Sequence, residues 1–290
     1  MPKKKQEKAK TSEPPPEPLP QDLPDDCPWK LSYRKTKDNR IVLFATMDQG
    51  SEGYCWTIVF SRMVSIHLYI HKKVKKLLNL SAKHLFANIE EKLDNGNLKS
   101  YKSLDAFLKN EGLVLEQECK CIVGKTEINS VQCDKVKDKE TFKILDFVVV
   151  EGDKVNESDI IHLLNTKGPI AAHIRVNRNF KKSYKGNDTD EMYYGPSNKG
   201  QIDDHIILLT GYATKNGVHY FEYQNSWGSK WGLDDGFGKF ARKISLPKNQ
   251  KSLVVAYMYP EVFSKGMNTL HLPLVLRKTG PEAELNFECG

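Results

Sequence analysis

Two strand-like runs joined by an Asn-Gly pair constrain the fold of this chain more than any other feature of its sequence. Residues 204–212 and 218–228 are rich in Ile, Leu, Tyr and Phe, and Asn216-Gly217 lies between them. Asn-Gly between two such runs is a strong short-range signal for a β-hairpin with a two-residue turn. We therefore predict an antiparallel pair of strands closed at this turn.

The register of this hairpin decides whether two of its polar residues meet. With Asn216-Gly217 as the turn, His205 lies opposite Gly228, and Asn225 is three residues away along the partner strand. Three residues of strand span roughly 10 Å, and an odd offset puts two side chains on opposite faces of a flat sheet. A bulge, a curl of the sheet or a wider turn must therefore close the gap if His205 and Asn225 are to act together.

A second informative segment, residues 48–56, prepares a cysteine for nucleophilic attack. Cys55 begins an apolar run that extends to Ile70 and is typical of a buried helix. A cysteine attacks as its thiolate, and the free N–H groups and positive dipole end of a helix start lower the pKa of a thiol. Gly50 and Gly53 allow the backbone to approach a bound molecule closely. For this segment alone, an inert core cysteine is an equal alternative.

Both segments together resemble the papain-like cysteine proteases. Residues 49–56 read Gln-Gly-Ser-Glu-Gly-Tyr-Cys-Trp, similar to the family's Gln-Gly-Ser-Cys-Gly-Ser-Cys-Trp, and residues 225–228 read Asn-Ser-Trp-Gly, as in the family. Cys55 and His205 lie about 150 residues apart, the spacing expected for the cysteine and histidine of a thiol protease. The resemblance covers residues 23–260. It implies an α+β, papain-like two-lobed fold, with a helical lobe packed against an antiparallel β-barrel lobe and the active site in the cleft between them.

The resemblance also implies a role for each motif residue. Cys55 is the expected nucleophile, His205 is its partner in a thiolate–imidazolium pair, and Asn225 is expected to orient His205. The Gln49 side-chain amide and the Cys55 backbone N–H are expected to form the oxyanion hole. The remaining residues that the resemblance assigns support the histidine or line the substrate cleft: Trp227 and Asp204, and Gly53 and Gly96.

The resulting hypothesis is a cysteine-type peptidase that hydrolyses protein or peptide substrates through a thioester acyl-enzyme, with neither metal nor cofactor. The sequence has no histidine-rich dipeptide that would form an occluding loop, so we expect an endopeptidase. Two alternatives stay open. One is a non-catalytic papain-like protein that binds peptides, which Tyr54 beside the nucleophile favours and the intact set of site residues disfavours. The other is a Cys-His acyl transferase, which an orienting asparagine disfavours.

The cysteines depart from the family pattern. The family's first-lobe bridges use cysteines at positions where this chain has Glu52 and Asn88. The chain has six cysteines: Cys27, Cys55, Cys119, Cys121, Cys133 and Cys289. Setting aside a free nucleophile leaves an odd number, which does not suit a closed disulfide framework. We therefore expect no obligatory disulfide in the first lobe and a protein of a reducing compartment.

Composition and motifs divide the chain into two lobes and two tails. Residues 1–28 are a Lys- and Pro-rich stretch expected to be disordered, 29–140 the helical lobe, 141–260 the β-barrel lobe, and 261–290 a C-terminal tail. The first stretch has no apolar core of a signal peptide and no room for the family's propeptide. We therefore expect an atypical member that is cytoplasmic or nuclear and not secreted.

Charge and hydropathy exclude two classes of partner. No run approaches the about 18 apolar residues of a membrane span, so no membrane partner is expected. The net charge of +7 is mild, and lysines without interleaved aromatic residues argue against a nucleic-acid surface. The oligomeric state stays open.

Local patterns also predict the bounds of the elements. Helices are expected to begin at Cys55, after Ser81, after Ser100 or Ser103, and after Asn156 or Ser158. Besides the hairpin, strands are expected over residues 142–150, 170–176, 238–242 and 253–259.

Overall fold

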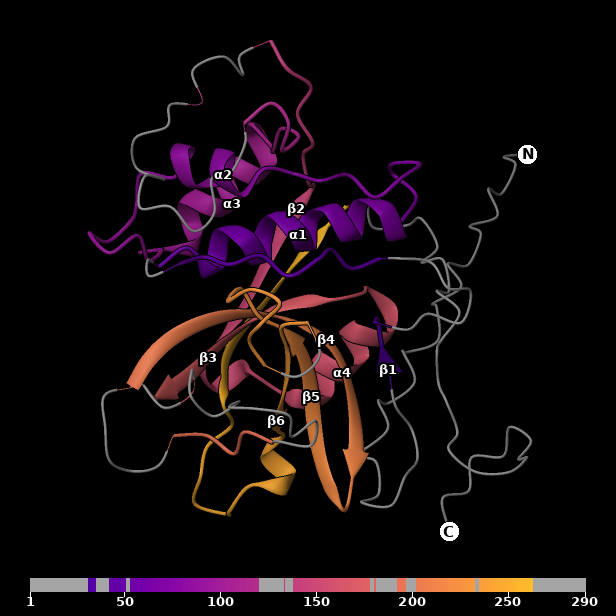
Figure 1. Ribbon diagram of the computed structural model, residues 1–290, viewed down its shortest axis with the longest axis vertical. Helices are drawn as coiled ribbons and strands as arrows, with labels where there is room; N and C mark the ends of the chain where they lie inside the picture. The colour runs from indigo at the N-terminus through magenta and orange to yellow at the C-terminus, as the bar shows by residue number, and fades with distance from the viewer. Residues whose placement is uncertain are drawn as a thin grey trace, which may run out of the picture.

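The helices and strands separate into a helical lobe and a sheet lobe, which lie one above the other in Figure 1. The computed structural model describes residues 31–34, 42–50, 53–119, 133, 138–177, 180, 192–196, 202–232 and 235–262. The helical lobe contains α1 (Cys55–Ile70), α2 (Ala82–Asn88) and α3 (Tyr101–Asn110), and α1 runs along its boundary with the sheet. The expected N-terminal tail, residues 1–28, lies outside the described residues, as does the expected C-terminal tail, residues 261–290, except for Glu261 and Val262.

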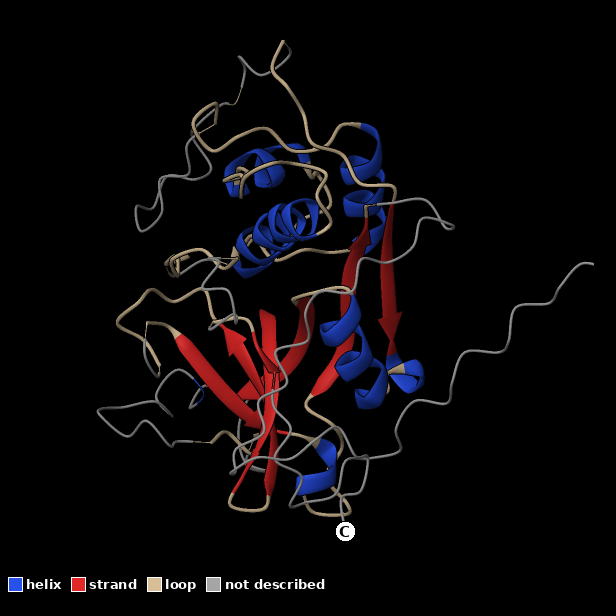
Figure 2. Ribbon diagram, turned by 90° about the vertical axis from the view of Figure 1, so that its right-hand side faces the viewer, coloured by secondary structure: helices blue, strands red, loops and turns tan. Residues whose placement is uncertain are grey.

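The sheet lobe is built on one antiparallel sheet of seven strands. Its strands are β1 (Leu31–Ser32), β2 (Asp146–Glu151), β3 (Ile170–Asn177), β4 (Ile202–Lys215), β5 (Val218–Gln224), β6 (Phe237–Ala241) and β7 (Val254–Glu261). Their order is β2-β7-β3-β4-β5-β6, and β1 pairs with β4. Figure 2 shows the strands fanning out below the helical lobe, with α4 (Glu157–Thr166) beside them. The short 3₁₀ helices η2 (Gly152–Lys154) and η4 (Lys243–Ser245) complete the described elements. The expected α+β fold, helices against antiparallel strands, is confirmed.

α1 is the central element of the molecule. Every residue of α1 except Tyr69 is buried, which is the pattern of a helix enclosed by protein on all sides. It packs against α2 on one side and against β4, β3 and β7 on the other. Both ends lie where the sequence predicts them, so Cys55 is the first residue of a helix that touches both lobes.

The helix starts follow the predicted caps. The Ser81 side chain accepts a hydrogen bond from the His84 N–H at 3.0 Å, and Ser100 caps α3 in the same way. The Asn156 side chain caps α4. α2 ends at Asn88, because the backbone becomes extended at Ile89. No described helix combines the length and hydropathy needed to cross a membrane.

The predicted hairpin is present and contains a bulge. Asn216 and Gly217 both have positive φ, 52° and 73°, as the two-residue hairpin turn requires. From this turn the β4–β5 register is regular as far as Gly211 and then shifts between Leu209 and Gly211. Beyond the shift, Leu208 pairs with Gln224. One extra residue in β4 therefore changes the partner of every β4 residue that precedes it.

β1 adds an early segment of the chain to this sheet. Leu31 pairs with Tyr212 and Ser32 with Gly211, and the Tyr33 hydroxyl donates to the Leu164 carbonyl at 2.8 Å. A Cβ on Gly211 would lie only 2.1 Å from the Leu31 carbonyl oxygen. Glycine is therefore required where β1 crosses β4, directly beside the bulge.

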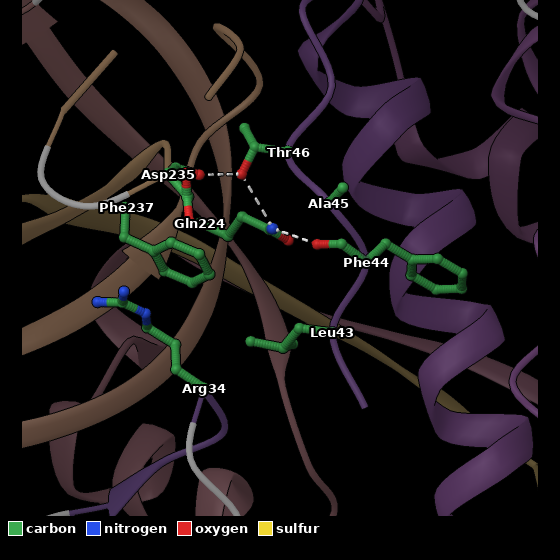
Figure 3. Close-up of a pocket in the computed structure, with 8 residues that line it drawn as sticks. All are labelled: Arg34, Leu43, Phe44, Ala45, Thr46, Gln224, Asp235 and Phe237. Carbon is green, nitrogen blue, oxygen red and sulfur yellow. Dashed lines mark hydrogen bonds between the residues drawn. The ribbon is translucent and has the colours of Figure 1, made fainter. Parts of the chain in front are cut away.

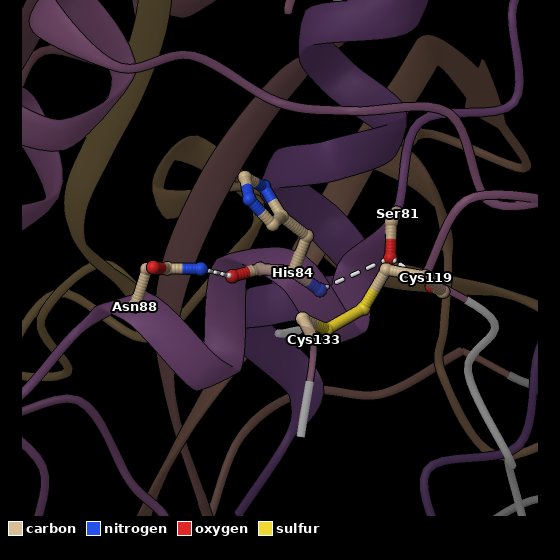
Figure 4. Close-up of a disulfide and its surroundings, with 5 residues drawn as sticks. All are labelled: Ser81, His84, Asn88, Cys119 and Cys133. Carbon is tan, nitrogen blue, oxygen red and sulfur yellow. Dashed lines mark hydrogen bonds between the residues drawn. A yellow bond between two sulfur atoms is a disulfide. The ribbon is translucent and has the colours of Figure 1, made fainter. Parts of the chain in front are cut away.

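The expectation of a first lobe without a disulfide is wrong. Cys119 and Cys133 are joined by a disulfide, which Figure 4 shows beside the start of α2. The Ser81 hydroxyl that caps α2 also donates to the Cys119 carbonyl at 2.5 Å. The prediction rested on the family's bridge positions, and this bridge instead joins two cysteines within the segment that follows α3. Among the described cysteines Cys55 is free, and the other cysteines lie outside the described residues. The location of the protein stays a prediction.

Candidate active site

The bulge in β4 brings His205 and Asn225 together. Because Leu208 pairs with Gln224, Asn225 lies level with Ile207, two residues from His205. An even offset places both side chains on one face of the sheet. His205 Nε2 lies 2.7 Å from Asn225 Oδ1, and both residues are buried. A regular hairpin would leave His205 and Asn225 too far apart to interact. Of the three possibilities that the sequence analysis names, a bulge, a curl of the sheet or a wider turn, the structure has the bulge.

The hydrogen bonds of Asn225 fix the proton on the His205 ring. Asn225 Oδ1 also accepts a hydrogen bond from the Ser226 backbone N–H at 2.8 Å. This oxygen is therefore the acceptor in its contact with Ser226 and in its contact with His205. His205 Nε2 must therefore carry the proton that it donates to Asn225. The other ring nitrogen, Nδ1, is then the basic nitrogen of the neutral imidazole.

Aromatic rings cover this hydrogen-bonded pair. The Trp227 ring stacks on the His205 ring, with centroids 4.6 Å apart and planes at 23°. Phe180, which is fully buried, packs edge-on against Trp227 at 5.5 Å, and Trp231 does so at 5.1 Å. Phe180 is a residue that the sequence reasoning missed, because it belongs to no motif. Together these rings keep water from the His205–Asn225 bond.

Cys55 lies against β4 at the residue that follows His205. The Ile206 backbone N–H donates to the Cys55 sulfur, as do the N–H groups of Cys55 and Trp56 at the start of α1. These donors lower the thiol pKa, but burial raises it more, and the pKa is about 11. The prediction that the helix start lowers the pKa of the Cys55 thiol is therefore wrong, because the sum of all contributions raises this pKa. A surface helix start favours the thiolate, whereas this one is enclosed by protein.

Gln49 is held by the segment that carries the asparagine motif. Its backbone N–H donates to the Ser226 carbonyl at 2.7 Å, and its side-chain Oε1 accepts the Ser226 hydroxyl at 2.5 Å. On either side, Asp48 forms a bridge with Trp227, and the Gly228 N–H donates to the Met47 carbonyl. With its amide oxygen bound to Ser226, the amide nitrogen is the end of Gln49 that can donate to a reacting oxygen.

Asp204 lies away from the histidine that it is expected to support. Successive residues of a strand point to opposite faces, so its side chain is on the face of β4 opposite His205. There Asp204 Oδ1 lies 3.0 Å from Nε2 of His173, a residue of β3. The structure therefore brings Asp204 to a second histidine that the sequence reasoning missed.

The two expected cleft glycines join a loop to the start of α1. The Gly53 N–H donates to the Asn95 carbonyl at 2.9 Å, and a Cβ on Gly53 would lie 2.1 Å from the Asn97 side chain. Gly96 is buried, and its carbonyl accepts the Trp56 indole N–H at 2.9 Å. Both glycines are thus required for close packing beside Cys55, and a role in lining the cleft stays a prediction.

Tyr54, which replaces a small residue of the family motif, is also buried. Its ring packs edge-on against Phe86 with centroids 4.6 Å apart, and Gly96 lies against the same ring. In this structure the tyrosine therefore fills space inside the helical lobe beside the nucleophile.

A cavity of about 220 Å³ lies on the other face of β5 (Figure 3). The Gln224 amide points away from the neighbouring Asn225 and donates to the Phe44 carbonyl at 2.7 Å and to Thr46 at 3.1 Å. The Arg34 guanidinium lies 4.2 Å above the Phe237 ring. This cavity is therefore separate from the site around His205. In the described part of the chain, no three His, Cys, Asp or Glu side chains are grouped so that they could hold a metal ion.

Known proteins are similar to this chain in sequence and in fold. A cysteine proteinase 3 from Dictyostelium discoideum is 28% identical over 198 residues, which cover 67% of this chain and 54% of that protein. The structure of digestive procathepsin L 3 from Tenebrio molitor larval midgut is similar with a TM-score of 0.62 and 20% identity, over 80% of this chain and 69% of that chain. A Carica candamarcensis cysteine protease is similar with a TM-score of 0.61 and 21% identity, over 81% and 99% of the two chains.

The chain spans about half the length of the curated relatives that it matches, 54% in the Dictyostelium protein. The papain family cysteine protease model matches residues 27–259, which include both motifs. This chain belongs to the papain family of cysteine proteases.

Proposed function

We propose that this chain is a cysteine-type peptidase in which Cys55, His205 and Asn225 hydrolyse peptide bonds. The observation that carries the proposal is the position of the His205 ring, which lies 2.7 Å from Asn225 Oδ1 and is stacked on Trp227. The same strand donates the Ile206 N–H to the Cys55 sulfur. Membership of the papain family supports the same chemistry.

The arrangement assigns a direction to each proton. Asn225 holds the Nε2–H of His205, so Nδ1 takes the proton of the Cys55 thiol as the sulfur attacks the substrate carbonyl. The tetrahedral intermediate collapses to a thioester, and His205 gives this proton to the leaving amine. Water then attacks the thioester with His205 again as the base, which releases the acid and restores the thiol.

Burial of Cys55 decides when the sulfur ionises. Burial raises the pKa of the Cys55 thiol to about 11, which favours the thiol over the thiolate at neutral pH. We therefore favour His205 as a general base during attack over a thiolate–imidazolium pair formed in advance. The Gln49 amide and the Cys55 N–H are the proposed oxyanion donors, and losing one such donor typically costs about 10²–10³ in rate.

Turnover of a fluorogenic peptide library by the purified protein tests this function. Cys55→Ala should abolish turnover with the fold intact, and Gln49→Ala should lower kcat by about 10²–10³. Gln224→Ala is the matched control, because it removes a neighbouring buried amide that binds Phe44 and Thr46 instead. Equal losses in the two glutamine variants would contradict the oxyanion role. Cleavage within long peptides, rather than from their ends, would support endopeptidase action.

A non-catalytic peptide-binding protein is the second candidate. The observation that favours it is the burial of Cys55, which raises the pKa of its thiol to about 11. A folded protein that binds peptides, shows no turnover and leaves Cys55 unlabelled by a peptide epoxide would support this candidate. Transfer of the acyl group to an added amine in preference to water would instead indicate an acyl transferase.

A further inference from the structure

The turn that follows α1 carries the densest cluster of positive charge in the described part of the chain. We call residues 72–76 the lysine turn, because the turn has one half-buried valine and four exposed lysines: Lys72, Lys73, Lys75 and Lys76. No ion pair among the described residues includes any of these four lysines. Lys167, in contrast, is paired with Glu261 at 2.9 Å. The charge of the lysine turn is therefore not balanced by a carboxylate within ion-pair distance in the described part of the chain.

The end of α1 fixes the backbone of the lysine turn. The Lys72 N–H donates to the Tyr69 carbonyl at 3.0 Å, and the Lys73 N–H donates to the Leu68 carbonyl at 2.8 Å. This pair of bonds is the Schellman motif, in which the residue at the position of Lys72 has positive φ and is usually glycine. Lys72 has a φ of 56°, where a side chain is strained. The chain thus has a lysine at a position where its backbone favours glycine.

The charge of the lysine turn acts on the protein around it. The pKa of His71 is lowered mainly by burial, and the charges of Lys167 and Lys73 lower it further, although Glu261 opposes them. A helix C-terminus favours cations only within its last turn, so the last two lysines gain nothing from the dipole of α1. An anion bound at the lysine turn would offset this repulsion between like charges.

The side chains of the lysine turn select among anions. An ammonium group is a point charge and lacks the planar fork with which arginine binds carboxylates, so a cluster of lysines alone suits tetrahedral oxyanions. The turn has no aromatic ring on which a base could stack, and Val74 and Leu77 are half-buried and unable to anchor in a membrane.

The spacing of the lysines selects further. Neighbouring lysines arise from Cα atoms about 3.8 Å apart, so the partner needs anionic groups at a similarly close spacing. In linear polyphosphate each phosphate shares an oxygen with the next, so its charges repeat more closely than those on successive sugar rings of a sulfated polysaccharide.

We propose that the lysine turn binds linear inorganic polyphosphate through charge pairs between its four ammonium groups and successive phosphates. The site is separate from the proposed catalytic residues, because α1 has 16 residues and spans about 24 Å between Cys55 and the turn. Binding at the turn therefore needs no peptidase activity.

Fluorescence anisotropy of end-labelled polyphosphate, titrated with the full chain at several salt concentrations, tests the proposal. Each lysine that neutralises a phosphate should contribute about 0.7 to the slope of log affinity against log salt, as for single-stranded nucleic acids. Four lysines predict a slope of about −3, or about a fiftyfold loss of affinity between about 50 and 200 mM salt.

Two fourfold variants separate the lysine turn from lysines in general. Changing all four lysines of the turn to Gln should abolish binding. The matched control changes four other exposed lysines to Gln and should bind as the unmodified protein does: Lys143, Lys154, Lys248 and Lys251. Equal losses in the two variants, or an unchanged salt slope in the first, would overturn the proposal.

A single substitution shows that a loss of binding is not a loss of fold. Lys72→Gly should reduce the salt slope by about 0.7 and raise the thermal unfolding temperature by about 2 °C, because glycine adopts positive φ without strain. An unchanged salt slope in Lys72→Gly would overturn the proposal.

The choice of polyphosphate is tested with other anions and with a second stretch of lysines. Single-stranded DNA, dextran sulfate, and vesicles of phosphatidylserine and phosphatidylcholine should each bind more weakly than polyphosphate, and tighter binding of any of them would overturn the choice. Residues 3–10 contain five lysines, and changing these five to Gln should leave binding unchanged. Loss of binding in that variant would overturn the assignment to the lysine turn.

Discussion

His67 makes the stability of this protein depend on pH in a way that can be measured. The ring is fully buried on α1, and its Nε2 lies 2.7 Å from the Pro169 carbonyl of the sheet lobe. A carbonyl only accepts, so Nε2 carries the proton of a neutral ring. Nδ1 has no hydrogen-bond partner among the described residues. A second proton would place an unsolvated charge near His71 and Lys167, and the His67 pKa is lowered to about 3, mainly by burial.

The sign and size of the effect follow from proton linkage. Since the folded pKa lies below the unfolded value, the unfolded chain binds the proton more readily as the pH falls below about 6.5. The contribution of His67 to stability is therefore complete above pH 6.5 and is lost as the pH falls toward 3. Each pH unit in this window costs about 1.4 kcal/mol, which amounts to about 2 kcal/mol at pH 5.

Urea unfolding at pH 7 and at pH 5 measures this loss. His67→Gln removes the titrating ring and keeps an N–H donor for Pro169, so it should lose about 2 kcal/mol less than the unmodified protein between the two pH values. His162→Gln, on the exposed face of α4, is the matched control and should lose as much as the unmodified protein. Parallel losses in all three proteins would refute the burial argument for His67.

Three further predictions concern the site and its strands. Asn225→Ala should slow turnover less than His205→Ala does, because Asn225 orients the base and carries no transferred proton; equal and total losses in folded variants would contradict these roles. The rate of Cys55 alkylation by iodoacetamide, followed by mass spectrometry, should keep rising until the pH approaches about 11, and a plateau below pH 7 would mean that an ion pair with His205 overrides burial. Gly211→Ala should lower the thermal unfolding temperature by several degrees, because its Cβ would lie 2.1 Å from the Leu31 carbonyl oxygen; an unchanged temperature would show that β1 can shift at little cost.

Local chemistry made much of the fold predictable. Ser81 and Asn156 cap helices as expected, because a side-chain oxygen at these positions satisfies a backbone N–H that the helix cannot. Asn216-Gly217 closes the expected hairpin, since both residues tolerate positive φ. These signals act over a few residues and need no knowledge of the rest of the chain.

The parts of the site that depend on distant contacts were not predictable. The register shift between Leu209 and Gly211 depends on how β4 pairs with β5, which the sequence of β4 alone does not reveal. β1 pairs with β4 at the same place. The raised pKa of Cys55 comes from burial by both lobes, which the motif around it does not encode. His173 and Phe180 carry no motif and reach the site only through the packing of β3 and the aromatic rings. The division into lobes at residue 140 stays a prediction.

The contacts at the two ends of α1 set how the lobes can move. Near its first residue, Gln49 is bound to Ser226, and near its last turn His67 is bound to Pro169.

α3 adds contacts away from the two ends of α1, because the Tyr101 hydroxyl lies 3.2 Å from His173 on β3 and Lys109 Nζ lies 3.1 Å from Asp146 on β2. Together these contacts oppose rotation of α2 and α3 about α1. They therefore hold Cys55 in place against β4.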